Sequence, residues 1–219
     1  MPRLLFEKTG NAIWISHLDL MRLFQRAFKR AGYPLTHTHG YNPRPSVSIA
    51  LPLSVGIESE CELLDFELDI ECESLEQLKN KLNESLIAGV FIRDVMPGGN
   101  KIRNLAYLVT RIRMHYDDGI PKNACALIEA LFKRDSLIVP KRTKNGIQDQ
   151  DILTMLRSID IETAGECVIE ITAVHCCQNP TLNPTQIVSA IINNAPDLTP
   201  DACEYRRIEI FDNNNNIFR

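Results

Sequence analysis

Two successive runs of strands and helices, each in the order βαββαβ, predict an α+β fold of two tandem ferredoxin-like modules with antiparallel sheets. The first module is expected over residues 1–100 and the second, divergent module over residues 101–219. Pro97-Gly98-Gly99-Asn100 interrupts the pattern and marks the boundary. A chain of 219 residues, 44% of them hydrophobic, is long enough to bury two small cores.

The first half contains the βαββαβ elements and one additional hairpin segment. A strand over residues 3–15 is expected to fold at Thr9-Gly10-Asn11. The other expected elements are a helix at 17–31, a strand at 35–39, a strand after the Gly40-Tyr41-Asn42-Pro43-Arg44-Pro45 loop, a strand at 64–71, a helix at 75–86 and a strand at 90–95.

The first helix is expected to begin at about His17, because Ser16 stands at capping distance ahead of Asp19. Apolar residues recur at intervals of three and four and predict the buried face: Leu20, Leu23, Phe24, Ala27 and Ala31. Cations gather on the opposite face: Arg22, Arg26, Lys29 and Arg30. Such a face is typical of a solvated helix, and also of a phosphate-binding surface, because arginine makes bidentate contacts to phosphate oxygens.

Three histidines lie near this helix in the sequence. His17 falls in the first helical turn, whereas His37 and His39 alternate along the strand at 35–39 and are expected to point to the same side. A His-x-His pair is a weak sign of a metal site without a third ligand, and His17 would supply one only if the strand ran beside the helix start. His17 and His39 are also the candidates for general acid or base chemistry, with ordinary packing or capping as the alternative.

The Gly40–Pro45 segment predicts a stiff loop, because glycine permits positive φ and each proline restricts the residue before it. It presents the ring of Tyr41, the amide of Asn42 and the guanidinium of Arg44. A ring that stacks on a base beside a cation that binds phosphate is typical of single-stranded RNA recognition. A rigid connection between strands is the structural alternative.

The formal net charge of -4 conceals a change of sign along the chain. The first fifty residues are mainly basic, whereas residues 58–76 contain carboxylates and no base. Strict alternation over residues 64–71 predicts a half-buried strand with an acidic outer face, which is either solvated or a docking surface for a basic protein.

No apolar stretch approaches the roughly twenty residues of a membrane span, and no basic-flanked leader is present, so a soluble, cytoplasmic protein with no membrane partner is expected. The cysteines are odd in number and scattered, which argues against a disulfide framework. With no Cys-x-x-Cys pair and no three-cysteine cluster, the sequence predicts no iron–sulfur cluster in this chain. No metal or other cofactor is assigned to it, with a metal at His37 and His39 as the open alternative.

The second half repeats the pattern without recognisable sequence repetition. The expected elements are a strand at 107–116, a helix at 123–132, extended pieces between 137 and 161, a strand at 167–175, a helix at 185–193 opened by Asn183-Pro184, and a strand at 205–211. The helix at 123–132 is expected to bury Ala126, Leu127, Ala130 and Leu131. Lys141, Arg142 and Lys144 predict a small basic hairpin or loop, and residues 213–216 a frayed polar tail.

The first sixty residues resemble the bacterial radical-SAM-linked family of unknown function. The resemblance rests on Ser16-His17-Leu18-Asp19, Arg22, Arg26, the loop with Gly40 and Pro43, and the run from Leu51 to Ser59. It extends over most of the chain and weakens after residue 104. Tyr41 stands where the family more often has phenylalanine, which keeps the aromatic ring. The resemblance implies a stand-alone partner of a radical S-adenosylmethionine (radical SAM) protein, which would carry the iron–sulfur cluster and S-adenosylmethionine.

These observations favour a non-catalytic accessory protein that presents a substrate, with RNA as the candidate, to a radical SAM enzyme in RNA modification. The residues expected to bind RNA or another anion are Arg22, Arg26, Arg30, Tyr41, Asn42 and Arg44. A second hypothesis is a metal-independent ribonuclease using His17 or His39, consistent with a fold-level similarity to the RAMP-type RNA-processing proteins of CRISPR systems. A third is a metal-binding or structural scaffold that depends on His37 and His39.

Overall fold

The computed structural model describes residues 1–72, 74–143 and 146–219, and the chain has an α+β fold with four α-helices in these ranges. The described residues form two compact units. The first comprises residues 1–104 together with 218–219, and the second comprises residues 105–217. The division after Asn104 lies close to the boundary expected at residue 100, whereas the return of the last two residues to the first unit has no signal in the sequence.

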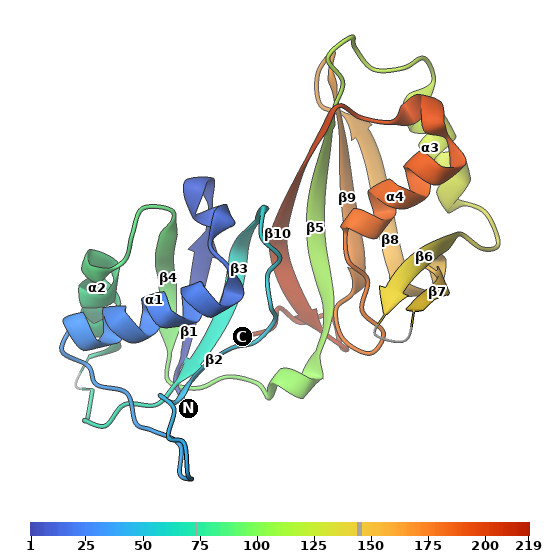
Figure 1. Ribbon diagram of the computed structural model, residues 1–219. Helices are drawn as coiled ribbons and strands as arrows, with labels where there is room; N and C mark the ends of the chain where they lie inside the picture. The colour runs from blue at the N-terminus through green and yellow to red at the C-terminus, as the bar shows by residue number, and fades with distance from the viewer. Residues whose placement is uncertain (73, 144–145) are drawn as a thin grey trace. The chain divides into compact units, whose positions relative to one another are not determined.

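The first unit has a four-stranded antiparallel sheet in the order β4-β1-β3-β2. Its elements are β1 (Arg3–Lys8), the 3-10 helix η1 (Gly10–Trp14), α1 (His17–Arg30), β2 (Val47–Ile49), β3 (Ile57–Phe66), α2 (Leu75–Ser85), β4 (Val90–Met96) and the 3-10 helix η2 (Ile102–Asn104). Without the 3-10 helices the element order is βαββαβ. Figure 1 shows α1 and α2 on one face of this sheet.

The core of the first unit lies between that face and the two helices. Phe6 of β1 meets Phe24 of α1 with ring centroids 4.8 Å apart, and Phe28 of α1 meets Phe66 of β3 at 4.9 Å. The predicted buried face of α1 is confirmed for Leu20, Phe24 and Ala27, while Leu23 and Ala31 are half-buried. The sequence reasoning missed Phe28, which is fully buried.

The predicted strand over residues 3–15 is wrong beyond Lys8, because the chain turns into η1. The Lys8 side chain is fully buried, and its ammonium donates to the carbonyl oxygens of Ile13 at 3.2 Å and Ile15 at 2.8 Å. The two carbonyl oxygens thus bond to the ammonium, and the Ile13 oxygen also accepts the backbone N–H of Gly56. A buried ammonium requires such acceptors, so burial of Lys8 favours the curled chain over the hairpin.

Two further strand predictions in the first half have the wrong bounds: residues 35–39 do not form a continuous strand, and the strand predicted at 64–71 lies at Ile57–Phe66. Residues 35–39 form only isolated bridges, including His37 with Pro45, because Pro43 and Pro45 have no N–H to extend a ladder. The strand predicted at 64–71 ends at Phe66, so the more distal carboxylates of the alternating run lie outside it. The acidic outer face predicted for that strand is therefore mostly wrong.

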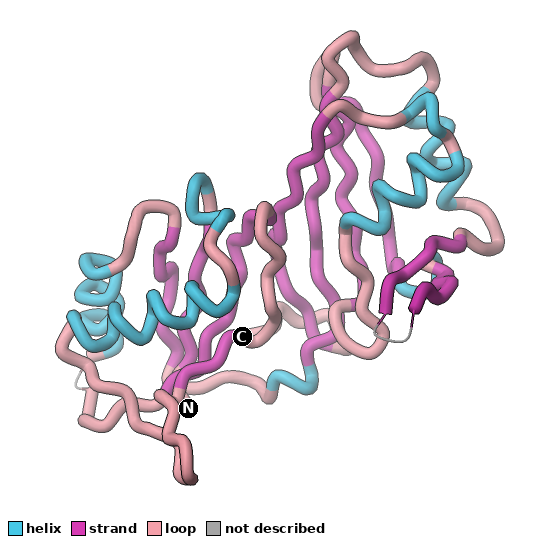
Figure 2. The backbone as a smooth tube through the Cα atoms, in the orientation of Figure 1, coloured by secondary structure: helices cyan, strands magenta, loops and turns pink. Residues whose placement is uncertain are grey.

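The second unit has a four-stranded antiparallel sheet in the order β10-β5-β9-β8 and a separate β6–β7 hairpin. Its elements are β5 (Leu105–His115), α3 (Ala124–Phe132), β6 (Ile138–Thr143), β7 (Gly146–Asp151), η3 (Leu153–Met155), β8 (Leu156–Thr163), β9 (Val168–Cys176), α4 (Thr185–Asn194), η4 (Pro196–Leu198) and β10 (Ala202–Asp212). Apart from the inserted hairpin, the order of elements and of strands matches that of the first unit. Figure 2 shows α3 and α4 on one side of the four long strands.

Two predictions for the second half need correction. Helix α3 buries Ala124, Ile128 and Leu131, whereas Leu127 is 49% exposed, so the predicted buried face is rotated. The tail is not frayed, because the Asp212 carboxylate accepts the backbone N–H groups of Asn214 and Asn216 at 2.8 and 2.9 Å. These hydrogen bonds lower the pKa of Asp212.

The predicted basic loop coincides with the β6–β7 hairpin, and its Lys144 lies outside the described residues. None of the helices in the described ranges is long and apolar enough to cross a membrane.

Candidate functional site

The start of α1 is held by a local cluster of polar side chains. The Ser16 hydroxyl accepts the backbone N–H of Asp19 at 3.2 Å, as predicted for an N-cap, and donates to the Asp19 carboxylate at 2.7 Å. A guanidinium nitrogen of Arg22 donates to the other carboxylate oxygen at 2.9 Å. The Ser16 hydrogen bond, and after it the Arg22 hydrogen bond, lower the pKa of Asp19. Arg22 is thus directed toward the helix start.

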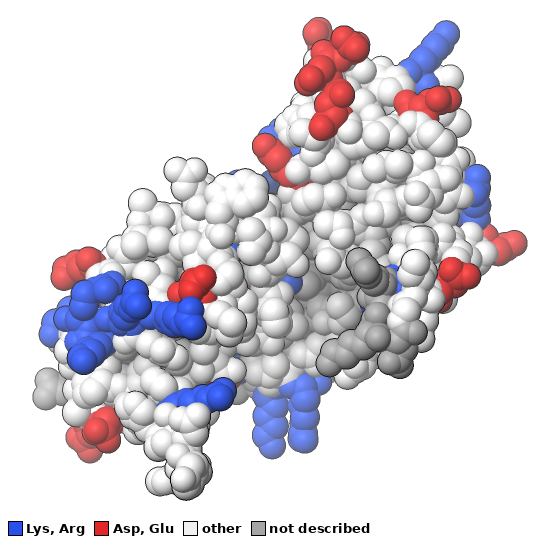
Figure 3. All heavy atoms as spheres, viewed as in Figure 1, with Lys and Arg blue, Asp and Glu red and all other residues white. Residues whose placement is uncertain are grey.

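The predicted cationic face of α1 lies on the surface of the first unit. All four of its side chains are exposed, and Figure 3 shows Lys and Arg side chains gathered over α1. Arg30 donates to the backbone oxygen of Ser85 at the end of α2. Within the described residues, the side chains of Arg26 and Lys29 make no hydrogen bond or ion pair. The face therefore contains two cations held by the protein and two available to an anion.

The loop after α1 is the tip of a short hairpin, which we call the Tyr41 hairpin (residues 36–46). The backbone N–H of Ser46 donates to the Thr36 oxygen, and that of Thr38 to the Arg44 oxygen, each at 2.8 Å. The Thr38 hydroxyl also accepts the Arg44 N–H at 3.0 Å. Both chains of the hairpin bond to Glu67 just beyond β3. The base of the hairpin is therefore fixed, and its tip projects from the unit (Figure 1).

The tip of the Tyr41 hairpin presents the three predicted side chains to solvent. Tyr41 has a relative exposure of 109%, so no part of its ring is covered. Asn42 and Arg44 are exposed as well. Gly40 has φ +139°, a backbone conformation that residues with a Cβ rarely adopt. A fully exposed ring on a braced turn is suited to stacking against a planar group.

The three candidate histidines, His17, His37 and His39, all lie in the first unit but form no recognised site. His17 is half-buried in the first turn of α1, and His37 and His39 are exposed on the Tyr41 hairpin. Across residues 1–72, 74–143 and 146–219, no three His, Cys, Asp or Glu side chains are grouped so as to hold a metal ion. No hydrogen bond links His17 to His39 in these ranges.

Two further features carry no sequence motif. Beside the start of α1, the side chains of Trp14, Leu18 and Val55 are exposed by 68%, 67% and 51%. The backbone N–H of Gly56 donates to the Ile13 oxygen at 3.0 Å, which brings Val55 close to Trp14. The second feature is a polar cavity in the second unit, formed by segments too far apart in the sequence to be read as one pattern.

The chain matches one family model and several solved structures. Residues 2–184 match the family described as "Uncharacterized protein conserved in bacteria (DUF2344)". A chain in the crystal structure of a Cbf5-Nop10-Gar1 complex superposes with a TM-score of 0.51 at 9% identity, covering 95% of this chain and 48% of that chain. The present chain thus spans about half the length of that one. No curated protein matches the chain.

Two other solved structures are similar at lower scores. A chain of the archaeal box H/ACA sRNP Nop10-Cbf5 complex has a TM-score of 0.47 at 10% identity, with 94% of this chain and 46% of that chain covered. An unknown protein from Galdieria sulphuraria has a TM-score of 0.27 at 10% identity, with 94% and 96% covered. Because these identities are 10% or lower, only the superposition with a TM-score of 0.51 supports an argument, and that argument concerns the fold alone.

Proposed function

We propose a function for this chain, which belongs to the bacterial family DUF2344. It is a non-catalytic accessory protein that binds RNA and presents the RNA to a radical SAM enzyme in RNA modification. The observation that carries the RNA part is the occurrence, in one compact unit, of unpaired surface cations and a fully exposed tyrosine on a braced hairpin. The partner enzyme would hold the iron–sulfur cluster and S-adenosylmethionine.

Each group has a distinct task in this proposal. Arg26, Lys29 and Arg44 contact phosphate oxygens, which supplies most of the affinity but no sequence information. Tyr41 stacks on an unpaired base, and the Asn42 amide meets the edge of that base. Arg22 and Arg30 contribute charge while they remain bonded to Asp19 and to Ser85. The chain positions the RNA, and the chemical step belongs to the partner.

We also propose that both units are ferredoxin-like modules. Their shared element order and the strand orders β4-β1-β3-β2 and β10-β5-β9-β8 support this assignment. The structure with a TM-score of 0.51 belongs to a protein crystallised in a Cbf5-Nop10-Gar1 complex, and its likeness to the present chain adds no residue to the site.

A salt titration of RNA binding tests the phosphate contacts. The logarithm of the affinity of a single-stranded RNA falls with the logarithm of the salt concentration by about 0.7 for each phosphate contact. The double variant Arg26→Gln/Arg44→Gln is therefore expected to reduce that slope by about 1.4, measured by fluorescence anisotropy with a labelled unpaired oligonucleotide. Tyr41→Ala is expected to weaken binding about tenfold or more while the slope stays unchanged, because stacking releases no counterions.

The control is the double variant Lys122→Gln/Arg134→Gln in the second unit, which also removes two positive charges, from exposed residues outside the proposed surface. Its slope should equal that of the unaltered protein. Absence of RNA binding at low salt would refute the RNA part of the proposal. Cleavage of the labelled RNA in the presence of a chelator would instead favour the ribonuclease hypothesis with His17 or His39.

The partner is tested by an anaerobic pull-down with the tagged chain, in which the captured proteins are identified. We expect a radical SAM protein, and we expect the variant Trp14→Ser to lose it while keeping RNA affinity, since exposed tryptophans dominate protein interfaces. The exposed Ile147 in the second unit provides the matched control Ile147→Ser, which should retain the partner. If both variants capture the partner equally, the exposed side chains of Trp14, Leu18 and Val55 are not the partner-binding surface. If no radical SAM protein is captured, the proposed partnership is refuted.

A further inference from the structure

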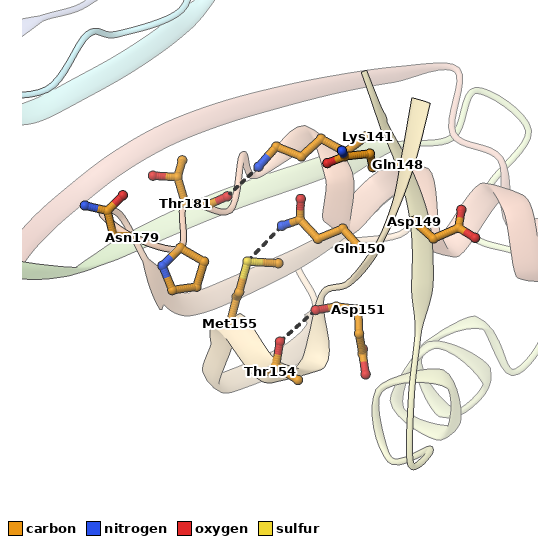
Figure 4. A pocket seen from close by; sticks show the side chains of 10 residues that line it. Lys141, Gln148, Asp149, Gln150, Asp151, Thr154, Met155, Asn179 and Thr181 are labelled. Carbon is orange, nitrogen blue, oxygen red and sulfur yellow. Dashed lines mark hydrogen bonds between the residues drawn. The ribbon is translucent and has the colours of Figure 1, made fainter. Parts of the chain in front are cut away.

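The second unit contains an open cavity of about 580 Å³, which is large enough for a nucleoside-sized ligand. It lies between the β6–β7 hairpin, the 3-10 helix η3 and the segment that follows β9. In Figure 4, Lys141, Gln150 and Met155 extend toward the segment that contains Asn179 and Thr181. The residues therefore come from two parts of the sequence and meet only in the folded unit.

The hydrogen-bonding groups in this cavity are only partly used. The Gln150 amide nitrogen donates to the Met155 sulfur at 2.8 Å, and a thioether is a weak acceptor. The Lys141 ammonium donates to the Thr181 backbone oxygen at 3.3 Å, which leaves two of its three N–H donors. Within the described residues, the Gln148 and Asn179 amides have no hydrogen-bond partner. Donors and acceptors are thus both available.

The acidic groups of the lining are directed elsewhere. One Asp151 carboxylate oxygen accepts the backbone N–H groups of Leu137 and Leu153, at 3.0 and 3.1 Å, and so holds the start of η3. The side chain of Asp149 points away from Gln150 and Met155 (Figure 4). The polar groups of the lining that remain are the amides of Gln148, Gln150 and Asn179 and the ammonium of Lys141.

The cavity also has an apolar part. Met155 is 2% exposed, and its sulfur lies beside the Gln150 amide. The Pro180 ring belongs to the opposite lining segment. Because Met155 is almost fully buried, the exposed Pro180 ring offers the apolar contact for one face of a planar heterocycle, while the amides reach its edge.

We infer that this cavity binds an unpaired nucleobase, one face of which lies against Pro180 and whose polar edge is bonded by Gln150, Asn179 and Lys141. The base belongs either to a free nucleoside or to a nucleotide of RNA, because the recognising groups contact the base alone. This site goes beyond the proposed function, which assigns RNA to the first unit, and it stands on different residues.

The test is an NMR titration of the isotope-labelled full chain with adenosine, guanosine, cytidine and uridine, with ribose as the control ligand. We expect at least one nucleoside to shift the side-chain amide signals of Gln150 and Asn179 in a saturable manner, and ribose to leave them unchanged. Because signals of the unaltered protein are observed, the result does not depend on whether a variant folds.

Two variants then identify the groups that bind. Gln150→Leu and Lys141→Met are each expected to weaken nucleoside binding at least tenfold, whereas Lys122→Met removes an exposed charge outside the cavity and should bind normally.

To find the source of the base, binding of a short RNA is compared with binding of the same RNA carrying one abasic position. A base-dependent gain over the free nucleoside identifies RNA as the source, and equal affinity identifies the nucleoside. Unchanged amide signals with every nucleoside and RNA, or normal binding by both variants, would overturn the inference.

Discussion

The variant Arg3→Met is expected to lower the free energy of unfolding by about 3 to 5 kcal/mol, the usual effect of breaking a buried ion pair from one side. Arg3 is 3% exposed, and its guanidinium makes two hydrogen bonds to Asp65 on the neighbouring strand, at 2.6 and 3.0 Å. The Asp65 side chain is only 21% exposed, so the substitution would leave a largely desolvated carboxylate without its partner.

The Arg3 guanidinium also closes the end of the first unit. It lies 5.4 Å from the ring centroid of the fully buried Phe218, and a Cβ at Gly99 would come within 2.4 Å of one of its nitrogens. Methionine has similar length but no charge, so the loss reflects the ion pair more than packing. Lysine at this position is expected to recover only part of the stability, since it cannot make the bidentate contact.

Urea denaturation of Arg3→Met and of the double variant Arg3→Met/Asp65→Leu would measure this effect. The double variant should be more stable than the single one, because no unpaired carboxylate remains. A single-variant loss below about 1 kcal/mol, as for a surface ion pair, would show that the pair is solvated in the folded protein.

Lowering the pH from 7 to 4 is expected to destabilise the protein by about 3 kcal/mol through His175 alone. His175 is fully buried on β9, where one ring nitrogen lies 2.9 Å from the Thr110 hydroxyl and the other 3.2 Å from the Cys176 oxygen. Burial lowers the pKa of His175 from 6.5 to about 4, with a further contribution from the charge of Arg207, against the opposing effect of the Cys176 hydrogen bond.

Whether the stability falls or rises with falling pH depends on which state of the protein, folded or unfolded, binds the proton more readily. Between pH 6.5 and about 4, the unfolded chain protonates His175 and the folded chain does not, so stability falls as the pH falls. Above pH 6.5 both states are neutral, and this contribution to stability is fully present. The size follows from about 1.4 kcal/mol for each pH unit between the two pKa values.

Denaturation curves recorded at closely spaced pH values measure the slope. His175→Gln keeps an amide that can bond to Thr110 but does not titrate, so its stability should vary less with pH in this interval than that of the unaltered protein. The carboxylates of Asp19 and Asp212 have lowered pKa values and act at lower pH in both proteins. Parallel curves for the two proteins would mean that His175 takes up its proton at the same pH in the folded and the unfolded state.

Local signals in the sequence were sufficient for the helices and for the groups at their ends. Ser16 and Asp19 form the predicted cap because both partners lie within one turn of the chain. The exposed cations of α1 and the exposed Tyr41 tip agree with their predicted places for the same reason, since amphipathic spacing and turn residues act over a few positions. The role of these residues in RNA binding stays a prediction.

Where several local structures had similar energies, contacts distant in the sequence decided the outcome. Residues 9–15 also depart from the predicted strand, although over a short range, because the buried Lys8 ammonium needs carbonyl acceptors five and seven residues away. Helix α3 is apolar on most sides, so its periodicity cannot select the face that buries Ile128. The tail is ordered because Asp212 bonds to its backbone and because Phe218, a residue of the first unit, is buried.

The sequence by itself therefore determined the α+β class, the four helices and a cationic helix followed by an aromatic loop, because these depend on interactions within a few residues. Only the tertiary structure decided the strand orders, the Arg3–Asp65 pair, the burial of His175 and the cavity of Gln150 and Asn179. Each of these joins segments that are far apart along the chain, and their meeting depends on how the whole core packs, which no local pattern encodes.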